Sequence, residues 1–109
     1  MNQHLPPTAG PVSDALVDII AELDRAVTKF PTWPSDIIHA STVVTEESGE
    51  LAQAALQYVY EGGDLDKARK EAVQTAVTAI RFIISHDDGN YFEADAYTSM
   101  EQLQHKQDI

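Results

Sequence analysis

Apolar residues recur at intervals of three and four along most of the chain, which is the period of an amphipathic α-helix. The first such run predicts a helix over residues 13–30, and Pro31 ends it. Ser13 or Asp14 can cap the start of this helix. The apolar face of the run consists of Val12, Leu16, Ile19, Ile20, Leu23, Val27 and Phe30.

Two longer helical runs follow, and they predict helices over about 37–61 and 65–85. Ser35 or Asp36 can cap the first of these, and the pair Gly62-Gly63 separates the two.

The ends of the chain carry weaker signals. Residues 86–90 break the helical pattern, and spaced apolar residues after them predict a fourth, weaker helix at 92–105. No strand-like alternation occurs, so the predicted fold is all-α, a small four-helix-type bundle. A Pro-rich segment at 1–12 is expected to be a flexible arm in front of a single domain at 13–109.

The helix predicted at 65–85 has an unusually wide apolar arc. One face carries mostly alanine and an adjoining face carries larger aliphatic residues, with Val73, Val77, Ile80 and Ile84 among them. A surface helix needs only one apolar stripe, so this helix is predicted to be buried on two sides. In a short chain we expect the second side to face another subunit, which gives a homodimer or a homotetramer.

Composition narrows the class of protein. The 109 residues include 7 Lys+Arg and 18 Asp+Glu, for a formal net charge of -11. Such a field repels a phosphate backbone and excludes a nucleic-acid polymer as the expected partner, but it attracts divalent cations. The chain has no cysteine, no signal peptide and no run of the roughly 18 apolar residues that a membrane span needs. We therefore expect a cytoplasmic protein with no membrane contact.

Carboxylates interrupt the apolar face of the helix predicted at 37–61. Glu47 falls in the middle of that face, and Glu46 and Glu50 fall on its edge in line with His39. Burying one unpaired carboxylate costs several kcal/mol, and three close together also repel one another. A bound Mg²⁺ relieves both costs, because it prefers hard oxygen ligands. The alternative is a solvated acidic face with no metal.

A second polar strip lies on the helix predicted at 65–85, formed by Glu71, Gln74, Thr78 and Arg81. If the two helices pack antiparallel, Glu71 faces the first carboxylate cluster. The alternative is a surface strip that makes only local hydrogen bonds.

Three further residues are candidates for substrate binding. Trp33 can stack on a nucleotide base or anchor its loop on the core, and His39 can meet a phosphate or remain an ordinary polar residue. Arg81 can offset phosphate charge or form an ion pair within the protein. The ligand spacing of a di-iron bundle and the glycine-rich loop of a P-loop protein are both missing.

The two acidic motifs together resemble those of a known family. Glu46-Glu47-Ser48-Gly49-Glu50 matches the pattern Glu-Glu-x-x-Glu, and Glu71-Ala72-Val73-Gln74 stands where a partner Glu-x-x-Asp is expected. With this helix layout, residues 13–85 are similar to the MazG-like branch of the all-α nucleoside triphosphate pyrophosphohydrolases.

This resemblance implies hydrolysis of a nucleoside triphosphate to the monophosphate and pyrophosphate, in a homodimer or homotetramer. It implies Mg²⁺, with Mn²⁺ as a substitute, and a glutamate that activates the attacking water. Carried over by position, the catalytic and metal-binding acids are Glu46, Glu47, Glu50 and Glu71. The rival function is a non-catalytic helical module that binds a nucleotide or a protein partner.

Gln74 departs from the family pattern, because it is an amide where the pattern has an aspartate. Its oxygen can still bind the metal. We interpret Gln74 as a weakened ligand, so a change to Asp is expected to leave the oligomer intact and to tighten Mg²⁺ binding. If its amide instead holds a phosphate or a neighbouring glutamate, the same change is expected to weaken it.

Overall fold

A computed structural model describes residues 10–92, and this part of the chain contains three α-helices and no strand. The helices are α1 (Pro11–Lys29), α2 (Ile37–Tyr60) and α3 (Leu65–Asp87). The all-α prediction is therefore confirmed for this part. The helix expected at 92–105 and most of the expected arm at 1–12 lie outside the described residues.

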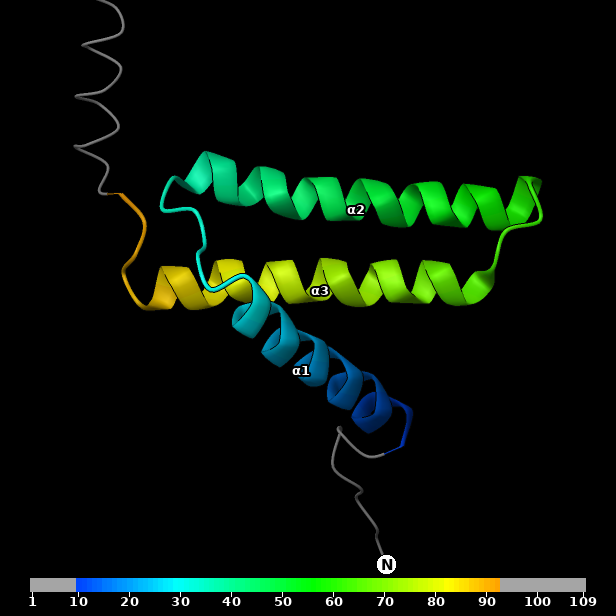
Figure 1. Ribbon diagram of the computed structural model, residues 1–109, viewed down its shortest axis with the longest axis horizontal. Helices are drawn as coiled ribbons and strands as arrows, with labels where there is room; N and C mark the ends of the chain where they lie inside the picture. The colour runs from blue at the N-terminus through cyan, green and yellow to red at the C-terminus, as the bar shows by residue number, and fades with distance from the viewer. Residues whose placement is uncertain (1–9, 93–109) are drawn as a thin grey trace, which may run out of the picture.

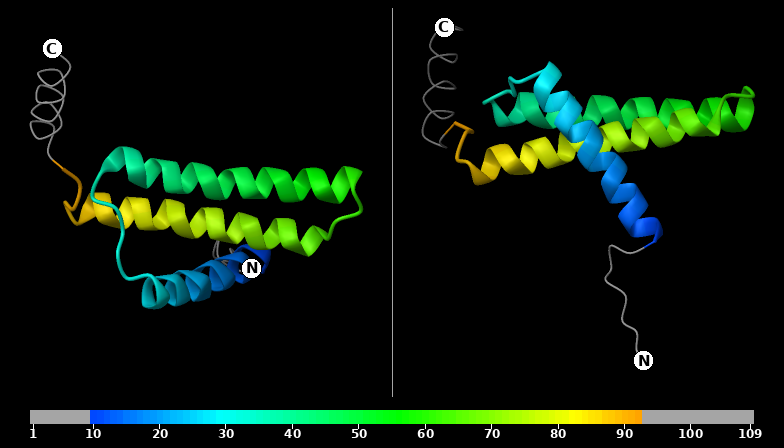
Figure 2. Two further views of the ribbon diagram at one scale, coloured as in Figure 1. Left: turned by 45° about the horizontal axis from the view of Figure 1, so that its top comes forward. Right: turned by 60° about the horizontal axis from the view of Figure 1, so that its bottom comes forward.

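The helix α3 is the central element of the fold. It runs antiparallel to α2 along its length, and α1 crosses it obliquely (Figures 1 and 2). Both α1 and α2 contact α3. The second neighbour of α3 is therefore a helix of the same chain, which accounts for part of its wide apolar arc without another subunit.

The helix α1 begins at Pro11, two residues before the expected start, and Gly10 rather than Ser13 or Asp14 occupies the cap position. Proline is favoured in the first helical position because its φ angle is already helical. An N–H at this position has no partner within the helix, so its absence in proline costs nothing. Gly10 has a φ of 64°, a value that glycine adopts without strain.

Aspartates cap the other two helices. Asp36 accepts hydrogen bonds from the backbone N–H groups of Ile38, at 2.8 Å, and of His39, at 3.4 Å. Asp64 accepts from the N–H of Asp66 at 2.9 Å. Of the two candidate caps for α2, Ser35 and Asp36, the structure therefore uses Asp36. Asp36 and Asp64 both satisfy backbone N–H groups that have no partner within the helix.

The helix α3 extends to Asp87, two residues past its expected end. It ends in a Schellman motif, in which the N–H of Gly89 bonds the carbonyl of His86 and the N–H of Asn90 bonds that of Ser85, at 3.0 and 2.9 Å. Gly89 has a φ of 69°. The glycine therefore sets the end of the helix, not the polar residues before it.

Small side chains form the buried core of the described residues. Its apolar members are Ala26, Ala40, Ala54, Ala68 and Val77. Alanines allow helix backbones to approach closely but bury little apolar area per residue. Larger apolar side chains stay exposed in the single chain, among them Ile20 at 61% and Ile83 at 55%. No helix within residues 10–92 is long and apolar enough to cross a membrane.

Candidate functional site

Three glutamates from two helices converge at the α2–α3 contact. Glu47 and Glu50 project from α2 and Glu71 projects from α3, and one carboxylate oxygen from each lies within 4.8 Å of the others. The antiparallel packing brings them together, because it sets the first third of α3 beside the middle of α2 (Figure 1). Glu71 thus faces the carboxylate cluster of α2, which is the placement predicted for antiparallel packing. We call these three residues the glutamate cluster.

Within the glutamate cluster, burial and the neighbouring carboxylates raise the pKa of Glu47 and of Glu71. Partial burial raises the pKa of Glu47, and the charges of Glu50, Glu71 and Glu46 raise it further. Burial also raises the pKa of Glu71, together with a hydrogen bond to Glu50 and the charge of Glu50, whereas Lys67 acts in the opposite direction. The positive groups near the cluster therefore do not balance the negative charge of its carboxylates.

One oxygen of the cluster lacks a protein partner. Glu71 Oε2 is buried and accepts no hydrogen bond from any residue between 10 and 92. A buried acceptor without a partner costs free energy, so such atoms are rare in folded proteins. Together with two other carboxylates within reach, this oxygen has the chemistry of a ligand for a hard divalent cation.

The other two predicted metal ligands are placed differently. Glu46 is exposed and is not one of the three converging carboxylates, although its charge contributes to the raised pKa of Glu47. Gln74 lies one turn after Glu71 on α3, and its Nε2 donates a hydrogen bond to Glu22 Oε2 of α1 at 2.5 Å. The amide therefore holds a neighbouring glutamate, which is the second of the two roles considered for it.

Glu22 and Arg25 are part of this site, and the sequence analysis missed both. The carboxylate of Glu22 also accepts hydrogen bonds from Arg25, whose Nε lies 3.0 Å from each of its oxygens. These bonds, first from Arg25 and then from Gln74, lower the pKa of Glu22. The spacing of Glu22 and Arg25 predicts a pair along α1, but only the crossing of α1 over α3 brings that pair to Gln74.

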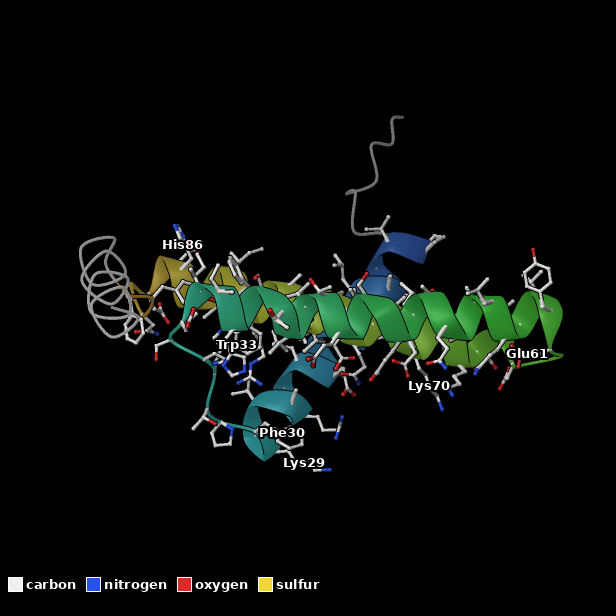
Figure 3. The ribbon with its side chains drawn as sticks, turned by 90° about the horizontal axis from the view of Figure 1, so that it is seen from above. Lys29, Phe30, Trp33, Glu61, Lys70 and His86 are labelled. Atoms are coloured by element: carbon white, nitrogen blue, oxygen red, sulfur yellow. The ribbon has the colours of Figure 1, made fainter. Side chains whose placement is uncertain are left out.

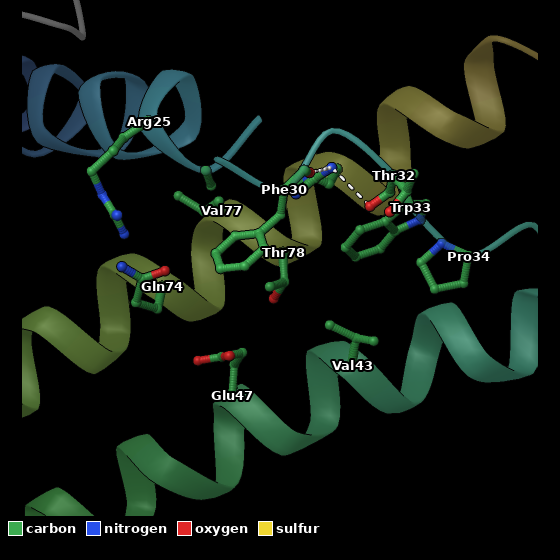
Figure 4. Close-up of a pocket in the computed structure, with 12 residues that line it drawn as sticks. Arg25, Phe30, Thr32, Trp33, Pro34, Val43, Glu47, Gln74, Val77 and Thr78 are labelled. Atoms are coloured by element: carbon green, nitrogen blue, oxygen red, sulfur yellow. Dashed lines mark hydrogen bonds between the residues drawn. The ribbon is translucent and has the colours of Figure 1, made fainter. Parts of the chain in front are cut away.

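A cavity of about 260 Å³ adjoins the glutamate cluster and shares Glu47 with it. Residues from all three helices and from the loop between α1 and α2 line it, as Figure 4 shows. Half of its lining residues are apolar or aromatic and half are polar or charged, and small-molecule sites also combine the two kinds. The lining residues are Arg25, Ala26, Phe30, Thr32, Trp33, Pro34, Val43, Glu47, Gln74, Val77, Thr78 and Arg81.

Two of the predicted substrate-binding residues, Trp33 and Arg81, line this cavity and also hold its walls together. Arg81 donates to the backbone oxygens of Phe30, at 2.8 Å, and of Thr32, at 3.4 Å (Figure 4), and its guanidinium lies 5.1 Å from the centre of the Trp33 ring. The Trp33 Nε1 donates to the hydroxyl of Tyr91 at 2.9 Å. Both side chains thus fix the loop between α1 and α2 against α3.

The third, His39, is exposed near the start of α2 and is not among the residues that line the cavity. Figure 3 shows that Phe30, Trp33 and Lys70 project on one side of the α2–α3 pair, whereas His86 projects on the other.

We compared the chain with protein-family models, with curated proteins and with solved structures, and nothing matches it.

Proposed function

We propose that this protein is a Mg²⁺-dependent nucleotide pyrophosphohydrolase, which cleaves a nucleoside triphosphate to the monophosphate and pyrophosphate. The observation that carries the proposal is the glutamate cluster, with its unpartnered Glu71 oxygen, at the edge of an aromatic cavity. The resemblance of the two acidic motifs to those of MazG-like enzymes supports the same reaction.

The donor set fits a hard divalent cation. Glu47, Glu50 and Glu71 each offer a carboxylate oxygen, and Mg²⁺ or Mn²⁺ takes such oxygens as ligands while retaining waters for a phosphate substrate. When bound, the metal supplies a positive charge that offsets the charge developing on the phosphoryl oxygens. Glu46 lies at the edge of the cluster and remains a candidate outer ligand.

The cavity suits the nucleoside part of the substrate. Phe30 and Trp33 offer aromatic rings for stacking on a base, and the volume of about 260 Å³ is of the size of one small group, not of a whole triphosphate. Glu47 belongs to both the cavity and the glutamate cluster. A base in the cavity therefore directs the phosphate chain toward the carboxylates, where a glutamate activates the attacking water.

The experiment that tests this proposal is an assay of pyrophosphate release from a panel of nucleoside triphosphates, with Mg²⁺, with Mn²⁺ and with chelator. We expect release that requires metal, and we expect Glu47→Gln to reduce it by at least a hundredfold. Glu61→Gln is the matched control, because Glu61 is an exposed glutamate at the end of α2, outside the cluster. Metal-independent release, or equal activity of the two variants, contradicts the proposal.

A non-catalytic nucleotide-binding module is the second candidate. The observation that favours it is the Gln74 amide, which is uncharged and bonded to Glu22, so this position adds no negative ligand to the cluster. The same panel separates the two functions: nucleotide binding in the presence of Mg²⁺, without release of pyrophosphate from any triphosphate, supports the binding module.

Assembly into a homodimer or homotetramer belongs to the same proposal. Its support is the set of large apolar side chains that the single chain leaves exposed on all three helices, such as Ile20, Val59 and Ile83 at 61, 64 and 55%. A monomer of this size rarely exposes so many, because apolar surface in contact with water is unfavourable.

A further inference from the structure

Two arginines line the cavity beside the glutamate cluster, and they differ in how far they are exposed and in which groups hold them. Arg81 is partly buried, stacks on Trp33, and donates to two backbone oxygens of the loop. Burial lowers its pKa. Its role is thus to fix the wall of the cavity.

Arg25 is bound differently. Its Nε and one terminal nitrogen, Nη2, donate to Glu22, whereas no hydrogen bond of its other terminal nitrogen, Nη1, is present among the described residues. The side chain is 54% exposed and projects from α1 toward Gln74 at the mouth of the cavity (Figure 4). It therefore has donors for an incoming anion.

The chain Gln74–Glu22–Arg25 fixes the direction of this arginine. The amide of Gln74 holds one oxygen of Glu22, and both oxygens of Glu22 hold Arg25. A guanidinium that is already oriented loses less conformational entropy when it binds a phosphate. The neutral amide at position 74 also adds no negative charge beside the path that a phosphate takes.

From this geometry we infer that Arg25 binds the phosphate groups of the substrate, and that Glu22 and Gln74 are positioning residues for it. The inference rests on the proposed function for the identity of the substrate, since it places the phosphate chain between the glutamate cluster and α1. Guanidinium groups suit this role because they are planar, always charged and donate in pairs to phosphate oxygens.

The chain offers a matched control for Arg25. Arg69 has the same exposed fraction, 54%, and also makes one ion pair, with Asp18 of α1 at 2.8 Å. Arg69 does not line the cavity that contains Glu47, although it lines a second cavity of about 430 Å³ together with Arg25, so parent-like binding by Arg69→Gln assigns the phosphate to the Glu47 side of Arg25. Substitution of either arginine by Gln removes one charge and one ion pair that involves α1, but only Arg25→Gln removes the proposed phosphate ligand.

The test measures binding of inorganic tripolyphosphate with Mg²⁺ by calorimetry, and KM and kcat for the preferred triphosphate, in the parent and in both variants. We expect Arg25→Gln to weaken tripolyphosphate binding and raise KM about tenfold or more, Arg25→Lys to recover part of the loss, and Arg69→Gln to bind like the parent. Glu22→Gln is expected to weaken binding less than Arg25→Gln, and a parent-like Glu22→Gln overturns the positioning role.

The outcomes keep this inference distinct from the proposed function. Tripolyphosphate binding that depends on Arg25 in a protein without hydrolytic activity supports the inference and contradicts the enzyme. Metal-dependent hydrolysis with equal binding by Arg25→Gln and Arg69→Gln overturns the inference and leaves the enzyme standing. A parent that neither binds tripolyphosphate nor hydrolyses a triphosphate overturns both.

Discussion

At the scale of single residues, Gln74 joins α3 to α1 through the hydrogen bond from its amide to Glu22. An aspartate here cannot donate this bond and places a second carboxylate against the first. We therefore expect Gln74→Asp to lower stability by about 1 kcal/mol or more, and to weaken Mg²⁺ binding rather than tighten it.

Thermal unfolding and a Mg²⁺ titration of the parent and of Gln74→Asp measure both effects. Gln53→Asp serves as the control for stability, since it adds the same charge at an exposed position of α2. Tighter Mg²⁺ binding in Gln74→Asp, with unchanged stability, is the result that shows Gln74 to be a weakened metal ligand.

Glu71 gives the second prediction at this scale. Burial and Glu50 raise its pKa, so its ionisation is less favourable in the metal-free fold than in the unfolded chain. Glu71→Gln removes that charge, and we expect it to raise the melting temperature of the metal-free protein. The same change removes a ligand, and it is expected to abolish the rise that Mg²⁺ or Mn²⁺ gives the parent, because only the folded cluster binds metal.

Melting curves with chelator and with excess metal check this pair of effects, with Glu61→Gln as the exposed control. A Glu71→Gln protein that melts lower than the parent without metal, and gains as much from metal, is incompatible with a metal site at the glutamate cluster.

At the scale of elements, the start of α2 depends on one side chain. Asp36 satisfies two backbone N–H groups of the first turn. Loss of such a cap typically costs about 1 kcal/mol, which lowers the melting temperature of a domain of 60–100 residues by about 4–8 °C. We expect this loss in Asp36→Ala and only a small one in Asp36→Asn, measured by thermal unfolding. Equal losses in the two variants contradict a capping role.

At the scale of the whole molecule, the outer surface of the α2–α3 pair has an open groove with mainly apolar walls. Ser41, Val44 and Thr45 of α2 line it together with Ala79, Phe82 and Ile83 of α3. We expect this groove to take part in the homo-oligomer, since apolar surface of this kind gains from burial.

Sedimentation at micromolar concentration is the measurement for this assembly. The parent is expected to sediment as a dimer or tetramer, and Ile83→Lys is expected to shift it toward the monomer. Thr42→Lys is the control at an exposed position of α2 outside the groove. A parent that sediments as a monomer rules out the assembly.

The sequence alone determined the three helices of the described chain and most of their ends. The reason is that helical periodicity, Asp36 and Asp64 as caps, and the glycines after α2 and α3 are local features. It also placed Glu47 on an apolar face, because the position of a side chain around a helix follows from its spacing. The start of α1 at Pro11 and the end of α3 at Asp87 each lie two residues outside the predicted helix. At both boundaries a nearby Pro or Gly sets the end of the helix.

Only the tertiary structure decided how the helices meet. The sequence left the relative direction of α2 and α3 open, and nothing local indicated that α1 crosses α3 at Gln74 and brings Glu22 and Arg25 to the site. It likewise engaged Nη2 of Arg81 with the loop backbone. These contacts join residues about fifty positions apart, and the angle at which two helices cross depends on the packing of many side chains at once.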